Sequence, residues 1–110
     1  MPTVRTGPVR VSGYAIKLRR VINAVLRDQY KKGELDSKKI NEQISDLNAK
    51  IYNVLVERFE IPKDAVANII LDFDVVEGNL KVNDIQVEIF DKDEILSKNT
   101  TNELKKILGL

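Results

Sequence analysis

The segment from residue 65 to residue 90 constrains the fold more than any other part of the sequence. Apolar and polar residues alternate from Ala67 to Val75, and Glu77-Gly78-Asn79 then interrupts the pattern. Alternation with a period of two places successive side chains on opposite faces of a strand. Gly and Asn can adopt the positive φ that a tight turn requires. The segment therefore predicts an antiparallel β-hairpin with one apolar face.

The return strand of this hairpin changes its alternation at Asn83-Asp84. Its apolar residues are Leu80 and Val82 before that point and Ile85, Val87 and Ile89 after it. One extra residue in a strand, a β-bulge, brings such side chains back to a single face. The sequence therefore predicts a bulge or kink at Asn83-Asp84.

Residues 12–32 predict a helix with two chemically distinct sides. At about 100° per residue, one side collects the apolar residues Tyr14, Leu18, Val21, Ile22, Val25 and Leu26. The nearly opposite side collects the basic residues Lys17, Arg20, Arg27 and Lys31. Ser12 is the predicted N-cap, and Gly33 is the predicted C-terminal stop.

A second helix is predicted from Asp36 or Ser37 to about Phe59, because Pro62 pushes the residue before it out of the helical region. Its apolar residues from Ile40 to Val54 recur at intervals of four, three, four and three, which is a heptad seam. Two heptads are fewer than a coiled coil needs, so packing against the first helix and a sheet is the favoured interpretation. The short connection makes the two helices antiparallel neighbours.

Two shorter elements complete the predicted fold. Val9-Arg10-Val11 alternates as a strand does, and Thr100 with Glu103 is a candidate capping box for a short C-terminal helix. The element order is then β-α-α-β-β-α. This is an α+β fold in which a small antiparallel sheet, formed by the N-terminal strand and the hairpin, is covered by the two long helices. We assign residues 1–98 to a single domain and residues 99–110 to a C-terminal helix or tail.

The composition excludes several classes of site. The 110 residues include neither Cys nor His, which removes disulfides, a thiolate nucleophile and the commonest metal ligand. Asp72, Asp74 and Glu88 form a carboxylate cluster on the hairpin, but acids that alternate along a strand more often form its solvated face. We therefore expect no metal, no cofactor and no enzymatic activity. No apolar segment approaches the length of a membrane span, so we expect a cytoplasmic protein with no membrane partner.

Charge is distributed unevenly along the chain. Residues 1–32 contain eight Lys or Arg and one acid, a net charge of +7, whereas the remaining residues contain ten bases and sixteen acids, a net charge of −6. The two parts give the overall charge of +1. Such segregation favours a polyanionic partner for the basic part. The alternative is that the basic and acidic segments pair within the fold.

The basic helix side and the segment before it supply the candidate binding residues. The candidate nucleic-acid-binding residues are Arg5, Arg10, Tyr14, Lys17, Arg19, Arg20, Arg27 and Lys31. Lys and Arg contact phosphates, and an exposed aromatic ring stacks on a base. Tyr30 and Tyr52 are further aromatic candidates. The alternatives are a half-buried core position for Tyr14 and a solvated face for the basic stripe.

Three sequence pieces resemble a family of small archaeal proteins related to the ThermoDBP single-stranded DNA-binding proteins. They are T-G-P-V-R-V-S-G-Y-A-x-K-L-R-R at 6–20, L-N-A-K-I-Y-N-V-L-V-E at 47–57 and D-F-D-V-V-E-G-N at 72–79. The resemblance covers residues 6–90 and implies a helix-and-sheet domain that binds single strands in a cleft of basic and aromatic side chains. The resemblance implies a role in binding the strand for Arg10, Tyr14, Lys17, Arg19 and Arg20. Some relatives assemble through a C-terminal leucine-zipper-like helix, whereas the tail here has only Leu104, Ile107, Leu108 and Leu110.

These observations predict a non-enzymatic nucleic-acid-binding protein that prefers single-stranded DNA to RNA or duplex. The alternatives are a homo-oligomeric structural or interaction module and an RNA- or ribosome-associated protein. Exposed apolar positions on a heptad seam or a terminal helix usually find a partner. We therefore expect a homodimer or a higher oligomer.

Overall fold

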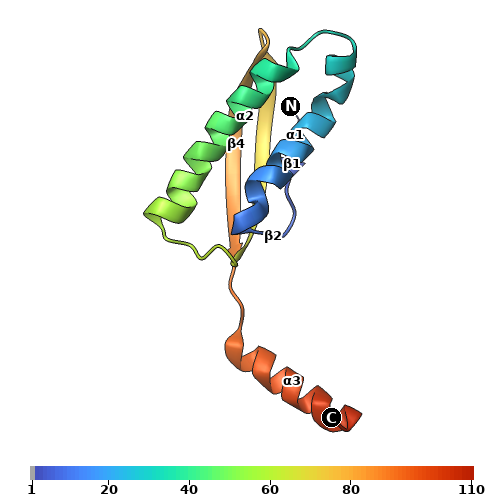
Figure 1. Ribbon diagram of the computed structural model, residues 1–110, viewed down its shortest axis with the longest axis vertical. Coiled ribbons are helices and arrows are strands. Elements are labelled where there is room, and N and C mark those ends of the chain that lie inside the picture. The colour runs from blue at the N-terminus through green and yellow to red at the C-terminus, as the bar shows by residue number, and fades with distance from the viewer. Residues whose placement is uncertain (1) are drawn as a thin grey trace.

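The computed structural model describes residues 2–110 and has the predicted α+β architecture, with a small antiparallel sheet and three helices (Figure 1). The elements in chain order are β1 (Thr3–Arg5), β2 (Val9–Arg10), α1 (Tyr14–Lys31), α2 (Ser37–Tyr52), β3 (Val66–Val76), β4 (Asn79–Phe90) and α3 (Glu94–Leu108). The order β-α-α-β-β-α is confirmed, with the N-terminal strand region divided into β1 and β2. The two long helices lie over one face of the sheet, and α3 extends away from it.

β3 is the central strand of the sheet. β4 pairs with it along one side, and the short strands β1 and β2 pair with successive parts of its other side. Val4 of β1 lies opposite Leu71, and Val9 of β2 lies opposite Ala67. Strand β1 was not predicted from the sequence, because three residues with one apolar position carry almost no periodic signal.

The predicted bulge is confirmed. Asp72 is paired with Asp84 and the next residue, Phe73, is paired with Val82, so Asn83 is the extra residue of β4. The Asn83 side-chain amide donates a hydrogen bond of 2.8 Å to Asp74 Oδ2. The bulge keeps the apolar side chains on both sides of it directed at the helices.

The hairpin turn differs in one detail from the prediction. Positive φ angles fall on Glu77 (54°) and Gly78 (77°), whereas Asn79 already belongs to β4. Two successive residues with positive φ are typical of the type I′ turn, whose twist matches that of the flanking strands. The predicted turn Glu77-Gly78-Asn79 is therefore one residue too long, because Asn79 is the first residue of β4 and Glu77 takes the other positive φ.

The core lies between the two long helices and the inner face of β3. Its largest fully buried side chains are Leu18 and Ile22 of α1, Ile40 and Ile44 of α2, and Ile69, Leu71 and Phe73 of β3. Burial of each such side chain contributes about 1.5–3 kcal/mol. The apolar residues that alternate on β3 therefore pack with those on one side of α1 and of α2 in a single apolar cluster.

The termini of α1 confirm one prediction and correct another. A 3₁₀ turn at Val11–Gly13 precedes the helix, and no side chain caps its N-terminus, so the assignment of Ser12 as N-cap was wrong. At the other end Gly33 adopts φ 72°, its N–H donates to Tyr30 O at 3.1 Å, and Glu34 N–H donates to Gln29 O at 2.9 Å. These two bonds form a Schellman motif, so the stop at Gly33 is confirmed.

Helix α2 begins and ends close to the predicted residues. The Asp36 side chain accepts hydrogen bonds from the backbone N–H of Lys38 and Lys39 at 3.0 and 3.4 Å. After Tyr52 the chain continues as a π-helical segment over Asn53–Arg58. The helical region therefore ends one residue before Phe59.

Helix α3 begins earlier than predicted. Asp93 is its N-cap and accepts a 2.8 Å hydrogen bond from the Leu96 N–H, so the assignment of Thr100 as the cap was wrong. The boundary drawn between residues 98 and 99 falls inside this helix. None of its residues is buried. The helix lies beyond the sheet along the longest axis of the molecule, which measures 61 × 31 × 21 Å.

Candidate nucleic-acid interface

A basic groove of about 430 Å³ runs between the outer sides of α1 and α2. Its lining residues are Arg20, Asn23, Ala24, Arg27, Tyr30, Lys31, Ser37 and Asn41. Helical spacing explains the composition, because residues 20, 24, 27 and 31 follow one stripe of α1. Three of the predicted basic residues are therefore brought together in one concave surface.

A chain of side-chain hydrogen bonds fixes the floor of this basic groove. The Tyr30 hydroxyl donates to Asn23 Oδ1 at 2.8 Å, and Asn23 Nδ2 donates to Asn41 Oδ1 at 2.8 Å. Asn41 Nδ2 in turn donates to the Ser37 carbonyl at 2.8 Å. Because both helices contribute to this chain, the Tyr30 ring is held in a defined position beside the cations.

Arg19 contacts α2 and does not line the basic groove. Its Nη1 donates to Asn41 O at 3.0 Å and to Asn41 Oδ1 at 2.9 Å, and its Nη2 donates to Ser45 Oγ at 2.6 Å. These three hydrogen bonds, all donated by Arg19, join α1 to α2. This geometry gives Arg19 a positioning role.

No cation of the basic groove forms an ion pair within the described part of the chain. Within residues 2–110 the ion pairs are Lys50–Asp46 at 3.1 Å and Lys92–Glu94 at 3.6 Å, and neither involves α1. Arg20, Arg27 and Lys31 are exposed. Their charges are therefore available to an anion in solution.

The other predicted bases lie elsewhere. Lys17 is half-buried on α1, one turn before Arg20, and does not line the groove. Arg5 lies opposite Ile70 and Arg10 lies opposite Val66, whereas their neighbours Val4 and Val9 face the helices. Strand alternation therefore directs Arg5 and Arg10 to the face of the sheet that the helices do not cover.

Tyr14 lies in the core. Only 3% of its surface is exposed, and its hydroxyl donates a 2.7 Å hydrogen bond to the Asn48 carbonyl oxygen. Burial, and to a smaller degree the neighbouring Tyr52, raises the pKa of Tyr14. A buried ring offers no face to a base, so the structure favours the core alternative for this residue.

Tyr30 is the aromatic residue that the sequence reasoning left out of the binding set. It is half-buried, and burial raises the pKa of its phenol. The signal for it was its spacing: it lies three residues after Arg27 and directly before Lys31. Residues three apart are neighbours on a helix.

The hairpin carboxylates do not converge on one point. Asn68 Nδ2 donates to Glu88 Oε1 at 2.8 Å, Thr3 Oγ1 donates to Asp72, and Asp74 accepts from Asn83. In the described part of the chain no group of three or more acidic side chains has a metal-binding arrangement. Likewise, no helix among residues 2–110 is long and apolar enough to cross a membrane.

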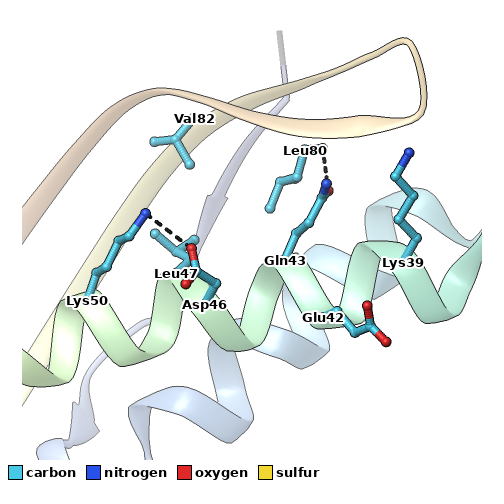
Figure 2. Close-up of a pocket in the computed structure, with 8 residues that line it drawn as sticks. All are labelled: Lys39, Glu42, Gln43, Asp46, Leu47, Lys50, Leu80 and Val82. Atoms are coloured by element: carbon cyan, nitrogen blue, oxygen red, sulfur yellow. Dashed lines mark hydrogen bonds and ion pairs between the residues drawn. The ribbon is translucent and has the colours of Figure 1, made fainter.

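A second groove separates α2 from β4, and Figure 2 shows its wider end. This end has a volume of about 600 Å³ and is lined by Lys39, Glu42, Gln43, Asp46, Leu47, Lys50, Leu80 and Val82. Gln43 spans the groove, because its Oε1 accepts from Leu80 N–H at 2.7 Å and its Nε2 donates to Asn79 Oδ1 at 2.9 Å. Leu47 and Lys50 also border a neighbouring apolar part of about 270 Å³, where Ile51, Val54, Leu55, Ile85 and Val87 complete the lining. We call both parts together the α2–β4 groove.

Comparison with known proteins identifies relatives of this chain. The sequence profile of a family described as "ThermoDBP-related, archaea" matches residues 4–81. The crystal structure of apeThermo-DBP-RP2 bound to ssDNA dT10 superimposes with a TM-score of 0.83 at 29% identity and covers 100% of this chain and 54% of that chain. The crystal structure of pfuThermo-DBP-RP1 superimposes with a TM-score of 0.72 at 29% identity and covers 98% of this chain and 74% of that chain. No protein of curated function matches.

Proposed function

The chain belongs to the ThermoDBP-related family of archaea, and on this premise we propose that it binds single-stranded DNA without enzymatic turnover. The observation that carries the proposal is the similarity of the whole chain to apeThermo-DBP-RP2, a protein whose structure is bound to ssDNA dT10. The chain spans about half the length of that relative. The proposal therefore concerns the part of the relative that the two proteins share.

The basic groove is the proposed binding surface. Arg20, Arg27 and Lys31 follow one side of α1, so at 1.5 Å per residue the outer two lie about 16 Å apart along the helix. Three unpaired cations along such a line can contact successive phosphates of an extended strand. Binding through three phosphate contacts corresponds to a slope of about −2 in a plot of log affinity against log salt, at about 0.7 per contact on single strands.

Tyr30 is the proposed stacking residue within this groove. Its ring lies beside Arg27 and Lys31, and the hydroxyl bond to Asn23 holds it in place. A base whose phosphate contacts these cations can therefore place its ring on Tyr30. Stacking tolerates any base, because every base has a π face, so we expect weak sequence preference.

The α2–β4 groove is a weaker candidate for the strand. Its lining contains two bases, Lys39 and Lys50, and two acids, Glu42 and Asp46. Lys50 is already paired with Asp46 at 3.1 Å, as Figure 2 shows. The lining of the basic groove has three bases and no acid, so the phosphate backbone favours the basic groove on charge.

Charge reversal tests the proposal. Arg20→Glu and Arg27→Glu should each weaken binding of oligo-dT and flatten the salt slope by about 0.7, measured by fluorescence anisotropy at several salt concentrations. Lys39→Glu is the matched control, because it reverses an exposed helix cation in the other groove. Melting temperatures of all three variants should stay near that of the parent. Unchanged binding by both arginine variants would refute this surface, and loss of binding by Lys39→Glu alone would move the strand to the α2–β4 groove.

The same assay with other nucleic acids tests the function itself. We expect oligo-dT to bind more tightly than an RNA of equal length or a DNA duplex. Tighter binding of RNA would favour the RNA-associated alternative. Absence of binding to all three at low salt would leave the structural or interaction module as the function.

We also infer that the chain forms a homodimer or a higher oligomer. The support is α3, which has no buried residue and exposes Leu104 (52%), Ile107 (71%) and Leu108 (68%). Light scattering should give a mass above the 12.5 kDa of one chain. A concentration-independent mass of a single chain would contradict this inference.

A further inference from the structure

We propose that the α2–β4 groove receives helix α3 of a second copy of this chain, and that the exchange is reciprocal. The proposal rests on the homo-oligomer inferred above and names the contact that forms it. It concerns a different surface from the basic groove, so the two can fail independently.

Helix α3 presents an apolar side that remains exposed within residues 2–110. At 100° per residue, Leu96, Leu104, Ile107 and Leu108 fall on one side, and Lys98, Asn102 and Lys105 fall on the other. The four apolar residues are between 52% and 71% exposed. An amphipathic helix of this kind is stabilised when its apolar side packs against another surface.

The α2–β4 groove is an apolar surface that the rest of the domain leaves open. Val82, Ile85, Val87 and Ile89 point from β4 to the helix side of the sheet, yet each remains about 40% exposed. The inner face of β3 is completely covered, because Ile69, Leu71 and Phe73 are fully buried, whereas the facing side chains of β4 remain partly exposed beside α2. The inner face of β4 is therefore only partly covered by α2.

The helix and the groove have matching lengths. α3 has 15 residues, which correspond to about 22 Å at 1.5 Å per residue. Beyond the Gln43 bridge at Leu80, the exposed apolar residues of β4 extend from Val82 to Ile89. These two residues lie opposite Phe73 and Ala67 of β3, and six steps of a strand span about 20 Å. One helix laid along β4 would cover the open apolar side chains of the groove.

The course of the chain favours a second copy as the source of this helix. α3 follows β4 after Asp91–Asp93 and leads away from its own sheet (Figure 1). The Asp93 cap marks the start of the helix, beyond the end of β4. A helix held away from its own groove is free to enter the groove of a partner, and two such exchanges related by a two-fold axis close a dimer.

Pairing of two α3 helices with each other fits the sequence less well. The helix offers two heptads, and its seam through Leu104 and Leu108 continues into Thr101 and Ser97. Both side chains are polar, and Thr101 Oγ1 donates to the Ser97 backbone carbonyl at 2.8 Å. Leu104, Ile107 and Leu108 have the i, i+3, i+4 spacing by which a helix anchors in a groove.

The absence of cysteine from the sequence makes disulfide trapping a clean test. We would mix full-length Ile85→Cys, carrying an affinity tag, with untagged full-length Leu104→Cys, and oxidise them at low concentration. A disulfide forms where the Cα atoms approach to about 4.4–6.8 Å. Leu96→Cys replaces Leu104→Cys in a parallel reaction, so that either direction of α3 in the groove is sampled. Lys105→Cys, on the polar side of α3, is the matched control.

The expected result is a mixed disulfide of tagged and untagged chains with Leu104→Cys or Leu96→Cys, and none with Lys105→Cys. An internal disulfide in the Ile85→Cys/Leu104→Cys double variant, without any mixed product, would overturn the proposal in favour of docking in cis. Cross-linking of Leu104→Cys to itself alone would overturn it in favour of paired α3 helices. Absence of any cross-link in all reactions would also overturn it.

Charge placed on either side of the contact gives a second measurement. Ile107→Glu and Val87→Glu should each reduce the light-scattering mass two-fold, to that of one 12.5 kDa chain, without lowering the melting temperature of the monomeric domain. Binding of a short oligo-dT to each variant should persist, because the basic groove is intact. Loss of oligo-dT binding by Val87→Glu with an unchanged mass would instead assign the groove to the strand and overturn the proposal. Arg20→Glu should leave the cross-link unchanged, so failure of DNA binding and failure of this contact are separately visible.

Discussion

The Tyr14 hydroxyl on α1 donates a 2.7 Å hydrogen bond to the Asn48 carbonyl oxygen on α2. Asn48 Nδ2 returns a bond of 3.2 Å to the Ala15 carbonyl. The two bonds join the first turn of α1 to the fourth turn of α2. They define Tyr14 as a residue that holds the two long helices together.

Tyr14→Phe should therefore affect stability but not binding. Loss of one buried hydrogen bond costs about 1 kcal/mol, which corresponds to a decrease of about 4–8 °C in melting temperature for a domain of this size. Affinity for oligo-dT should match that of the parent. Normal stability with weakened binding would show that the hydroxyl acts on the strand instead.

High pH should destabilise the fold through the same residue. Burial, with a smaller effect of Tyr52, raises the pKa of Tyr14 in the folded state, whereas the unfolded phenol ionises near pH 10 (about its usual value). Between these two pKa values the folded state holds a proton that the unfolded state has released. The free energy of unfolding therefore falls as pH rises from about 10 to the folded pKa and is constant below that range.

Denaturation with urea from about pH 8 to about pH 11 measures this dependence. Tyr14→Phe should lose less stability over the alkaline part of the range than the parent. Tyr30 contributes in the same direction, because burial also raises its pKa, so Tyr30→Phe is the appropriate second variant. If the parent and both variants lost equal free energy of unfolding at alkaline pH, the two tyrosines would not be the source of the pH dependence.

Tyr30→Ala should weaken binding of oligo-dT by about 1–3 kcal/mol, the contribution of one stacked base. The salt slope should not change, since no phosphate contact is removed. Tyr30→Phe keeps the ring and should bind nearly as the parent does. Tyr52→Ala is the control, because Tyr52 is exposed on α2 and does not line the basic groove. Parent-like binding by Tyr30→Ala would exclude stacking on this ring.

Deletion of Asn83 should be tolerated. The residue is the extra member of the bulge, so its removal leaves Val82 and Ile85 on the helix side and makes the ladder regular. Deletion of Gln86 is the matched control, because it also removes one exposed polar residue but turns Asp84 toward the core. The melting temperature should fall far more for the Gln86 deletion. Equal decreases would mean that the bulge does not set the register.

The sequence predicted the hairpin, the bulge and both long helices because each depends on local periodicity. The alternation from Ala67 to Val75 and the spacing from Leu18 to Ile22 are properties of single elements. The start of α3 was missed because Asp93 and Thr100 are both good caps, and only the backbone selects between them. Strand β1 was missed because its pairing with β3 joins residues about seventy positions apart.

The candidate site was predictable only in part, because the sequence pattern of one helix does not show its contacts with another element. Arg20, Arg27 and Lys31 share a helix stripe, and the structure places all three in one groove. Arg19 lies on the same helix, but its partners Asn41 and Ser45 belong to α2, and single-helix geometry does not contain them. Tyr14 lay at the rim of the apolar side, and packing between two helices decides whether such a ring is covered.

Asn83 also affects how molecules of this protein behave toward one another when crowded. Within residues 2–110, β4 pairs with β3 alone, so one side of its backbone is unpaired along 12 residues. An unpaired edge is a template for further strands and, with repetition, for fibrils. The bulge at Asn83 increases the local twist and interrupts the even spacing of donors and acceptors, and Lys81, Asp84 and Glu88 add charge to the same strand. The edge of β4 is consequently a poor template, and the protein should resist fibrillar aggregation at high concentration.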